Sequence, residues 1–88
     1  MAAPLTVSVV SADREVWTGE ASQIIAKTVE GEIGILAGHE PMLAILAGGE
    51  VRVTALDGSR VVVDAADGFL SVDNNVVQVV AGRASIVA

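Results

Sequence analysis

Apolar and polar side chains alternate along much of the chain, which is the pattern of β-strands that bury one face. In residues 5–10 this alternation places Leu5, Val7 and Val9 on a single face. Further runs with strand character are residues 15–20, 21–29, 33–35, 51–55, 61–65, 69–72 and 76–80. The chain is therefore predicted to be built from short strands.

Turn-forming residues separate these runs roughly every eight to twelve positions. Gly19 is expected to end the second strand, and Asp57 with Gly58 supplies the residues of a tight hairpin. Other turn signals lie at residues 11–14, 38–41, 48–49, 67–68 and 73–75. About eight to ten short strands in one all-β domain over residues 1–88 indicate a β-sandwich or barrel.

Two segments fit a helix as well as a strand. Residues 21–29 carry a helical stripe, but their Ile, Thr and Val side chains lose rotamer freedom in a helix, so a strand is preferred. Pro41 can occupy the first position of a short helix over residues 42–47, and a short strand is the alternative there.

Composition and charge exclude several classes of function. The net charge is −6 and the five basic residues are scattered, so neither nucleic-acid binding nor a polybasic membrane patch is expected. There are no cysteines, which rules out disulfides and thiolate metal sites. The apolar run at residues 42–47 is too short to span a bilayer, and residues 1–4 do not start like a secretory signal. A soluble intracellular domain is expected.

Candidate catalytic chemistry is sparse. His39 is the single imidazole, and no serine stands in a strained, glycine-flanked turn beside it. A metal site of Glu32, His39 and Glu40 lacks a ligand-spacing signature, and Asp64 with Asp67 fits a solvated turn better than a pair of catalytic acids. We therefore predict no catalytic residues, no metal site and no cofactor.

One stretch, GEIGILAGHEPML at residues 31–43, concentrates the unusual features of the chain. Gly34 lies between Ile33 and Ile35, where a neighbouring backbone is expected to approach closely. The glycine spacing matches neither a dinucleotide fingerprint nor a phosphate-binding loop. Aliphatic residues crowd this region, either closing one end of the core or forming a partly exposed contact patch: Leu36, Met42, Leu43, Ile45 and Leu46. The single tryptophan, Trp17, fits a core anchor or an interface residue.

This stretch resembles the signature G-E-[IL]-G-I-x-P-G-H-x-P-[LM]-L of the epsilon subunit of F-type ATP synthases. Residues 5–11, residues 16–19, the GFLSV run at 68–72 and the VVA run at 79–81 resemble other parts of the same family. The resemblance implies a β-sandwich of about ten strands, which is non-catalytic and sits on the rotor. There the family's domain bridges the gamma subunit of the central stalk and the loops of the membrane c-ring. It implies a peripheral location at the cytoplasmic face of the bacterial plasma membrane.

The resemblance also assigns residues to roles. Glu32 and His39 correspond to contacts with the c-ring, with Glu40 and Leu43 beside them, and Ser11 corresponds to a gamma contact. Gly31, Gly34, Gly38 and Pro41 are implied to shape the signature loop. The acidic side chains of Glu32 and Glu40 would set the orientation and association rate of binding to the c-ring more than its affinity.

The chain departs from the family pattern in two places. Ala37 stands where the family has proline, so the turn before Gly38 is expected to be looser. The family's C-terminal helical hairpin, which carries its inhibition of ATP hydrolysis and ATP binding, does not follow residue 88. The chain is expected to be either a truncated piece or a naturally short member, and those activities are not assigned to it.

Two other functions compete with this interpretation. A biotinyl- or lipoyl-carrier domain would use Lys27, the only lysine, at a hairpin tip, but the sequence around Lys27 lacks the usual carrier context. A small enzyme or ligand-binding sandwich has no constellation of residues behind it.

Overall fold

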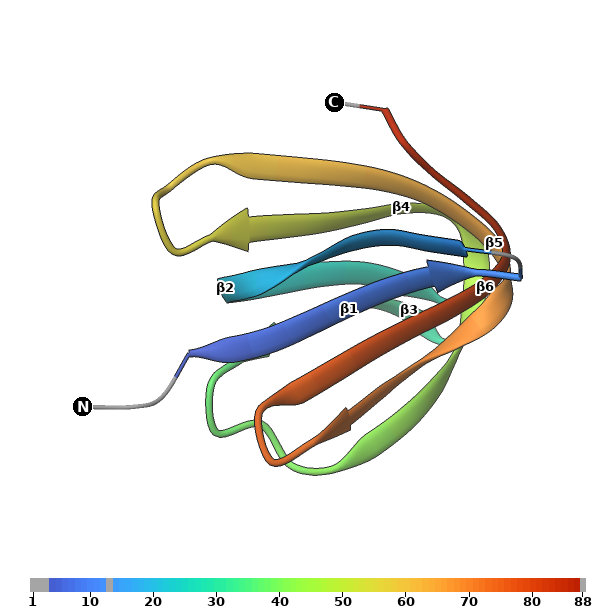
Figure 1. The fold of residues 1–88 in the computed structure, drawn as a ribbon. Helices are drawn as coiled ribbons and strands as arrows, with labels where there is room; N and C mark the ends of the chain where they lie inside the picture. The colour runs from blue at the N-terminus through green and yellow to red at the C-terminus, as the bar shows by residue number, and fades with distance from the viewer. Residues whose placement is uncertain (1–3, 13, 88) are drawn as a thin grey trace.

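The computed structural model describes residues 4–12 and 14–87, and all of its regular elements in these ranges are strands (Figure 1). They are β1 (Leu5–Ser11), β2 (Arg14–Thr28), β3 (Gly31–Leu36), β4 (Met42–Ala55), β5 (Arg60–Asp73) and β6 (Val76–Ile86). Within the described ranges no helix is long and apolar enough to cross a membrane. The all-β prediction is confirmed. The expectations for residues 1–3 and for Asp13 in the first turn fall outside the described residues.

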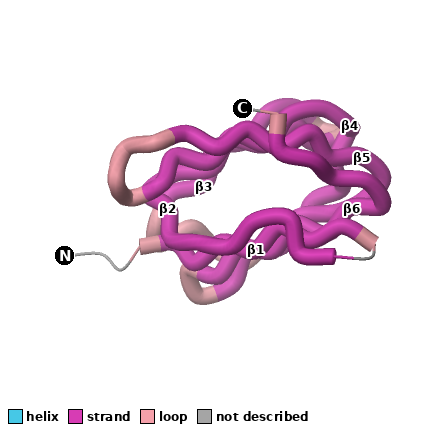
Figure 2. The backbone as a smooth tube through the Cα atoms, turned by 45° about the horizontal axis from the view of Figure 1, so that its top comes forward, coloured by secondary structure: helices cyan, strands magenta, loops and turns pink. Residues whose placement is uncertain are grey.

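The strands pair in the order β1-β6-β5-β4-β2-β3, and an additional β1–β2 pairing closes a ring of strands. β3 is attached to the outside of this ring through β2 alone among the described strands. Every pairing is antiparallel except β1 with β6. Seen from its end, the ring is flattened into two layers (Figure 2), and side chains fill the space between them.

The long strands bend and contribute to both layers. β4 pairs with β5 in two separate ladders, residues 42–45 with 69–72 and residues 49–54 with 60–65. One layer holds β1 with the first parts of β2, β4 and β6 and the second part of β5. The other holds β3, the second parts of β2 and β4, the first part of β5 and the end of β6. The predicted count of about ten strands is therefore corrected to six continuous strands in residues 4–12 and 14–87.

Positive-φ residues make these bends. Gly48 and Gly49 (φ 85° and 130°) lie inside β4, and Asp67 (φ 61°) lies inside β5. We name these two sites together, residues 48–49 and 66–68, the bend. The sequence predicted chain reversals here, which is wrong, because a left-handed backbone residue can kink a strand without ending it.

Close approach at the bend depends on Gly68. A Cβ atom placed on Gly68 would overlap the carbonyl oxygen of Val80 and lie 2.5 Å from the Cα of Ala81 on β6.

Gly19 also lies inside a continuous strand, so the prediction that it ends a strand is wrong. A Cβ atom there would lie 2.8 Å from two ring carbons of Trp17, which indicates that the indole lies across this glycine.

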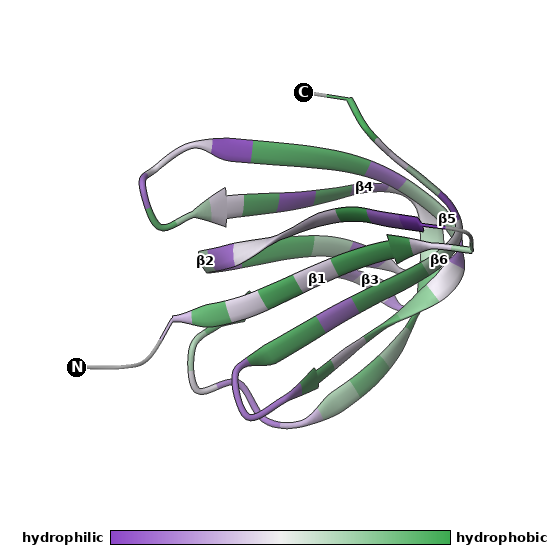
Figure 3. Ribbon diagram, viewed as in Figure 1, coloured by the Kyte–Doolittle hydropathy of each residue, from purple (hydrophilic) through white to green (hydrophobic). Residues whose placement is uncertain are grey.

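The two ambiguous segments are both strands. Residues 21–28 continue β2, as preferred from their β-branched residues, and residues 42–47 belong to β4 rather than to a helix. The hydropathy of neighbouring residues alternates along the strands (Figure 3). The inward-facing residues are aliphatic, and Leu5, Val7 and Val9 are fully buried as predicted.

The one polar residue in the described core is satisfied. Thr28 is 5% exposed; its Oγ1 donates to the carbonyl oxygen of Gly31 (2.7 Å) and accepts from the N–H of Glu30 (3.1 Å). Because burial without such partners would cost free energy, these bonds help to fix the β2–β3 turn.

Candidate functional site

The signature residues 31–43 lie along one side of the sandwich, where each layer ends in a strand without an outer neighbour. β3 pairs only with β2, and residues 42–45 of β4 pair in a ladder only with β5, within the described chain. The two edges are joined at one end by the pairing of Thr28 with Leu46 and by the N–H of Val29, which donates to Ile45 (3.0 Å). We name this region, β3 with residues 37–43, the open side.

Each of these two edges carries a partly buried apolar side chain. Ile33 and Met42 are partly buried and pack against the core there. Because the alternation of β3 turns Ile33 and Ile35 inward, Glu32 and Leu36 face outward on the same strand. The open side thus consists of strand edges and outward side chains that no other described strand covers.

Glu32 lies at the β2–β3 end of the open side. It is exposed and pairs across the ladder with Lys27. Together they line a shallow groove of about 370 Å³ with Ile25, Gly49, Glu50 and Arg52. Arg52 forms an ion pair with Glu50 (3.3 Å), and both side chains are more than half exposed, so this pair adds little stability. The groove carries charges of both signs.

The loop at the other end begins with a closed turn. The N–H of His39 donates to the carbonyl oxygen of Leu36 (3.1 Å), and Gly38 has φ 86°. These are the features of a type II turn with Ala37 at its second position, where proline is common. The turn was expected to be looser than the family's because proline is replaced by Ala37, yet its hydrogen bond is formed.

His39 is half-buried, and its ring is held by its neighbour. Nδ1 lies 2.8 Å from the carbonyl oxygen of Glu40. A carbonyl oxygen only accepts, so Nδ1 must donate, and Nε2 is left to meet a partner. Glu40 and Pro41 are exposed, and β4 begins at the next residue.

The structure does not bring the three candidate metal ligands together. Glu32 and Leu36, at the two ends of β3, are roughly 13 Å apart along the strand, and His39 lies beyond Leu36. No group of His, Cys, Asp and Glu that could hold a metal is found in the described part of the chain. Glu32 and His39 therefore lie at two separate places on the open side.

Asn75, which the sequence pattern did not single out, fixes the β3–β4 loop by a hydrogen bond. The side-chain Oδ1 of Asn75, in the β5–β6 turn, accepts the N–H of Gly38 at 2.8 Å. The sequence indicated only that residues 73–75 form a turn. The partners are 37 positions apart, and no local pattern predicts such a bond.

The signature glycines differ in what they do. Gly31 and Gly38 have positive φ (119° and 86°), a conformation that favours glycine. A Cβ atom on Gly34 would meet nothing within 4 Å. The prediction of a close backbone approach at Gly34 within the domain is therefore wrong.

The predicted aliphatic patch is divided between surface and core. Leu36, Leu43 and Ile45 are 58%, 68% and 55% exposed, whereas Leu46 is 6% exposed and Met42 is partly buried. Across the layer, Ile45 pairs with Phe69, Phe69 with Val80, and Val80 with Val10. We name the outward face formed by these residues the apolar face: Val10, Leu43, Ile45, Phe69 and Val80.

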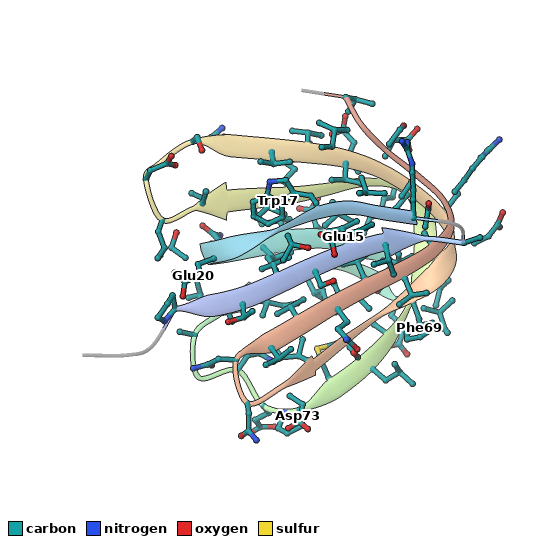
Figure 4. All side chains as sticks on the ribbon, viewed as in Figure 1. Glu15, Trp17, Glu20, Phe69 and Asp73 are labelled. Carbon is teal, nitrogen blue, oxygen red and sulfur yellow. The ribbon has the colours of Figure 1, made fainter. Side chains whose placement is uncertain are left out.

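Acidic residues lie on the same layer as the apolar face, and one of them, Glu15, is directly next to it. Glu15 pairs with Val10, Glu20 pairs with Thr6, and Asp73 pairs with Val76. Figure 4 shows these three side chains and Phe69 on the strands of this layer. Trp17, between Glu15 and Glu20 in the sequence, is only partly buried and packs against the core, which fits the core-anchor alternative.

Ser11 lies away from the signature residues. It ends β1 next to Val10, it is half-buried, and its Oγ donates to the carbonyl oxygen of Arg14 (3.4 Å). It also lines a shallow depression with Arg14 and Arg83. Ser11 thus borders the apolar face, and Leu43 belongs to both the apolar face and the open side, whereas Glu32, His39 and Glu40 lie on the open side alone.

Among the carboxylates of the described residues, one has a clearly shifted pKa, and it lies in the β4–β5 hairpin. The Oγ and the N–H of Ser59 both donate to Oδ1 of Asp57, at 2.6 and 2.9 Å. These bonds favour the ionised form and lower the pKa of Asp57. The carboxylate is fully exposed and remote in sequence from the open side.

Comparison with known proteins gives a consistent result along the chain. Residues 4–87 match the family model described as "ATP synthase, Delta/Epsilon chain, beta-sandwich domain". The ATP synthase epsilon chain of Micrococcus luteus is 50% identical over 82 residues, which cover 93% of this chain and 90% of that one. That of Frankia casuarinae is 41% identical over 83 residues, covering 94% and 98%.

Other relatives match over a shorter stretch. The ATP synthase epsilon chain of Streptomyces coelicolor is 56% identical over 43 residues, 49% of this chain and 35% of that one. The chain thus matches about a third of the length of the first such relatives. Among solved structures, a chain in the Euglena gracilis mitochondrial ATP synthase, in a structure of OSCP, F1 and c-ring, superimposes with a TM-score of 0.89. That chain is 28% identical, and the match covers 96% of this chain and 54% of that one.

Proposed function

Because the chain belongs to the ATP synthase delta/epsilon family, whose β-sandwich domain its residues 4–87 match, we propose that it acts as a non-catalytic rotor subunit joining the gamma subunit to the c-ring. The family assignment agrees with the resemblance of the signature stretch. It disfavours the carrier alternative, and Lys27 lies inside β2 opposite Glu32 rather than at a hairpin tip. The proposed location is the cytoplasmic face of a bacterial plasma membrane, as part of the synthase.

The observation that carries the proposal is that residues 31–43 all fall along the open side. Glu32 at one end and His39 with Glu40 at the other are accessible to loops of the c-ring. The spacing of these polar groups along two strand edges fits a partner that presents several short loops side by side. Charged groups at such a contact chiefly set orientation and association rate.

The apolar face is the proposed contact with gamma, except at Leu43, which this face shares with the open side and which is proposed to contact the c-ring. Exposed aliphatic and aromatic residues that are contiguous across neighbouring strands are characteristic of protein interfaces. Ser11, implied as a gamma contact by the resemblance, borders this face next to Val10. The acidic residues on the same layer, Glu15, Glu20 and Asp73, favour a partner with basic residues at its rim.

The fold suits a mechanical role. Strand ladders close on themselves around one aliphatic core, and such close-packed interiors deform little and transmit strain. Torque applied at the open side by a rotating c-ring would therefore reach gamma through the apolar face without chemistry in this domain. In this mechanism the subunit couples proton flow to ATP synthesis as a rigid link.

The test separates the two contacts with matched variants. The domain is mixed with the gamma subunit, and separately with the c-ring in lipid nanodiscs, both from the matching synthase, and the affinities are measured. Glu32→Gln is expected to weaken c-ring binding about three- to tenfold at low salt and less at high salt, with gamma binding unchanged. Glutamine is used because lysine would place like charges opposite Lys27. Glu20→Gln is the charge control and should leave c-ring binding unchanged.

Ile45→Glu is expected to do the reverse. Ile45 is exposed on β4 at the edge of the apolar face, so a charge there should weaken gamma binding roughly 10- to 100-fold and leave the thermal unfolding curve near that of the wild type. Ile86→Glu is its control, because Ile86 is similarly exposed at 49% but lies at the end of β6 in the other layer. If the wild-type domain binds neither partner at micromolar concentrations, the proposed function is wrong.

A further inference from the structure

Asn75 connects three segments that are distant in the sequence. Its side-chain Oδ1 accepts the N–H of Gly38 in the β3–β4 loop (2.8 Å). Its own carbonyl oxygen accepts the N–H of Thr6, at the start of the parallel β1–β6 ladder (2.7 Å). The tip of the β5–β6 hairpin is thus bonded both to β1 and to the loop that carries His39 and Glu40.

Backbone conformation alone does not explain an asparagine at this position. Asn74 and Asn75 both have left-handed φ values, 51° and 62°, as a tight hairpin of this kind requires. Glycine satisfies that requirement equally well, and asparagine tolerates it. The side chain of Asn74 makes no hydrogen bond with the described residues, whereas that of Asn75 reaches Gly38. What distinguishes Asn75 is its acceptor oxygen.

The loop has few other ties to the body of the domain. Residues 37–41 lie between two edge strands, and the other described hydrogen bonds of this loop are local. The His39 N–H donates to Leu36, and the His39 ring donates to Glu40. Only the bond to Asn75 joins the loop to a different part of the described chain. Removal of its acceptor would leave the turn closed but free to move against the sandwich.

We propose that Asn75 is a positioning residue for the open side, which fixes the loop so that His39 and Glu40 meet the c-ring in one orientation. The side-chain oxygen orients the Gly38 peptide, and Gly38 precedes His39 directly. The contribution to docking is preorganisation, because a loop that is ordered before binding loses less entropy on binding. The identity of the partner rests on the proposed function, but the hydrogen bond to Gly38 does not.

The test compares Asn75→Gly with Asn74→Gly. Both variants keep a residue that adopts left-handed φ in the same turn, and only the first removes the acceptor oxygen. In the isolated domain, hydrogen exchange of the Gly38 amide, measured by NMR, is expected to become roughly five- to tenfold faster in Asn75→Gly and to stay unchanged in Asn74→Gly. Asn75→Asp retains an acceptor oxygen and is expected to restore the protection.

Docking provides the second measurement. Asn75→Gly is expected to weaken binding to the c-ring in nanodiscs roughly five- to tenfold, with gamma binding and the two Asn74→Gly affinities unchanged. Equal Gly38 exchange in the two glycine variants would overturn the inference, and so would faster exchange with unchanged c-ring affinity. If the wild-type domain does not bind the c-ring at all, the proposed function is wrong. If the wild type and Asn75→Gly both bind the c-ring with equal affinity, the proposed function stands and the inference about Asn75 is wrong.

Discussion

The bend and the open side both contain glycines, and the two regions use them differently. At the bend, Gly68 lies so close to the backbone of β6 that a methyl group would overlap the Val80 carbonyl oxygen. On the open side, Gly34 faces open space. The fold therefore requires the first glycine and not the second. A glycine that the domain does not need, on the strand edge where the signature residues lie, leaves the backbone of β3 accessible to another molecule.

The largest effect expected from this difference is on the free energy of unfolding. Gly68→Ala should destabilise the domain by about 2–3 kcal/mol, because the added Cβ atom meets rigid backbone of β6 rather than a movable side chain. For a domain of this size, the melting temperature should fall by roughly 10–20 °C. Thermal unfolding followed by circular dichroism measures it.

Gly34→Ala is the matched control for that change. Alanine there meets no atom within 4 Å, and glycine within a strand is less stable than alanine, so the free energy of unfolding should stay the same or rise by up to about 1 kcal/mol. A fall as large as that of Gly68→Ala would contradict the assignment of Gly34 to an open surface. Because stability is preserved, any loss of c-ring affinity in Gly34→Ala would report on the interface itself.

The sequence predicted the buried faces better than the path of the chain. Alternation identified Leu5, Val7 and Val9 as core residues, because side-chain direction in a strand depends only on position. It failed at Gly19, Gly48 and Asp67, where a strand passes through residues typical of turns. At Gly48 and Asp67 φ is positive. A positive φ is the same local event in a bend as in a reversal, and the outcome depends on whether a distant strand continues to pair on the far side.

The sequence located the residues of the candidate site along the chain, but it did not predict how they are arranged on the surface. The signature at residues 31–43 identified the family, and the structure places these residues on two strand edges from different layers. The separation of Glu32 from His39 follows from the extended conformation of β3. The link from Asn75 to Gly38 depends on how two hairpins meet, and the sequence around either residue contains no sign of it.

A smaller effect is expected from stiffening the open side. Ala37→Pro should raise the free energy of unfolding by about 0.4–1 kcal/mol, because proline restricts the unfolded chain and is favoured at this position of a type II turn. The preceding residue, Leu36, is in a strand, a conformation that proline permits in the residue before it. Thermal unfolding measures the gain, and c-ring affinity should be kept. A loss of stability would show that the turn at residues 36–39 is not of this type.

The smallest effect should come from the β4–β5 hairpin, whose turn is held by its own residues rather than by a distant one. The bonds from Ser59 lower the pKa of Asp57 in the folded state. They therefore contribute stability that is complete above the unfolded pKa of about 4 and is lost as the pH falls through the folded pKa. In Asp57→Asn this part of the pH dependence should disappear between pH 5 and pH 2, as measured by thermal unfolding. Asp73→Asn, in a turn where no hydrogen bond to the carboxylate is found among the described residues, should retain it.

Because the hairpin is separate from both proposed contacts, Asp57→Asn should bind gamma and the c-ring as the wild type does. Asn75→Gly, in contrast, should bind the c-ring more weakly than the wild type. Equal c-ring affinities of Asp57→Asn and Asn75→Gly would show that a turn held across the molecule matters no more for docking than one closed by its own side chains.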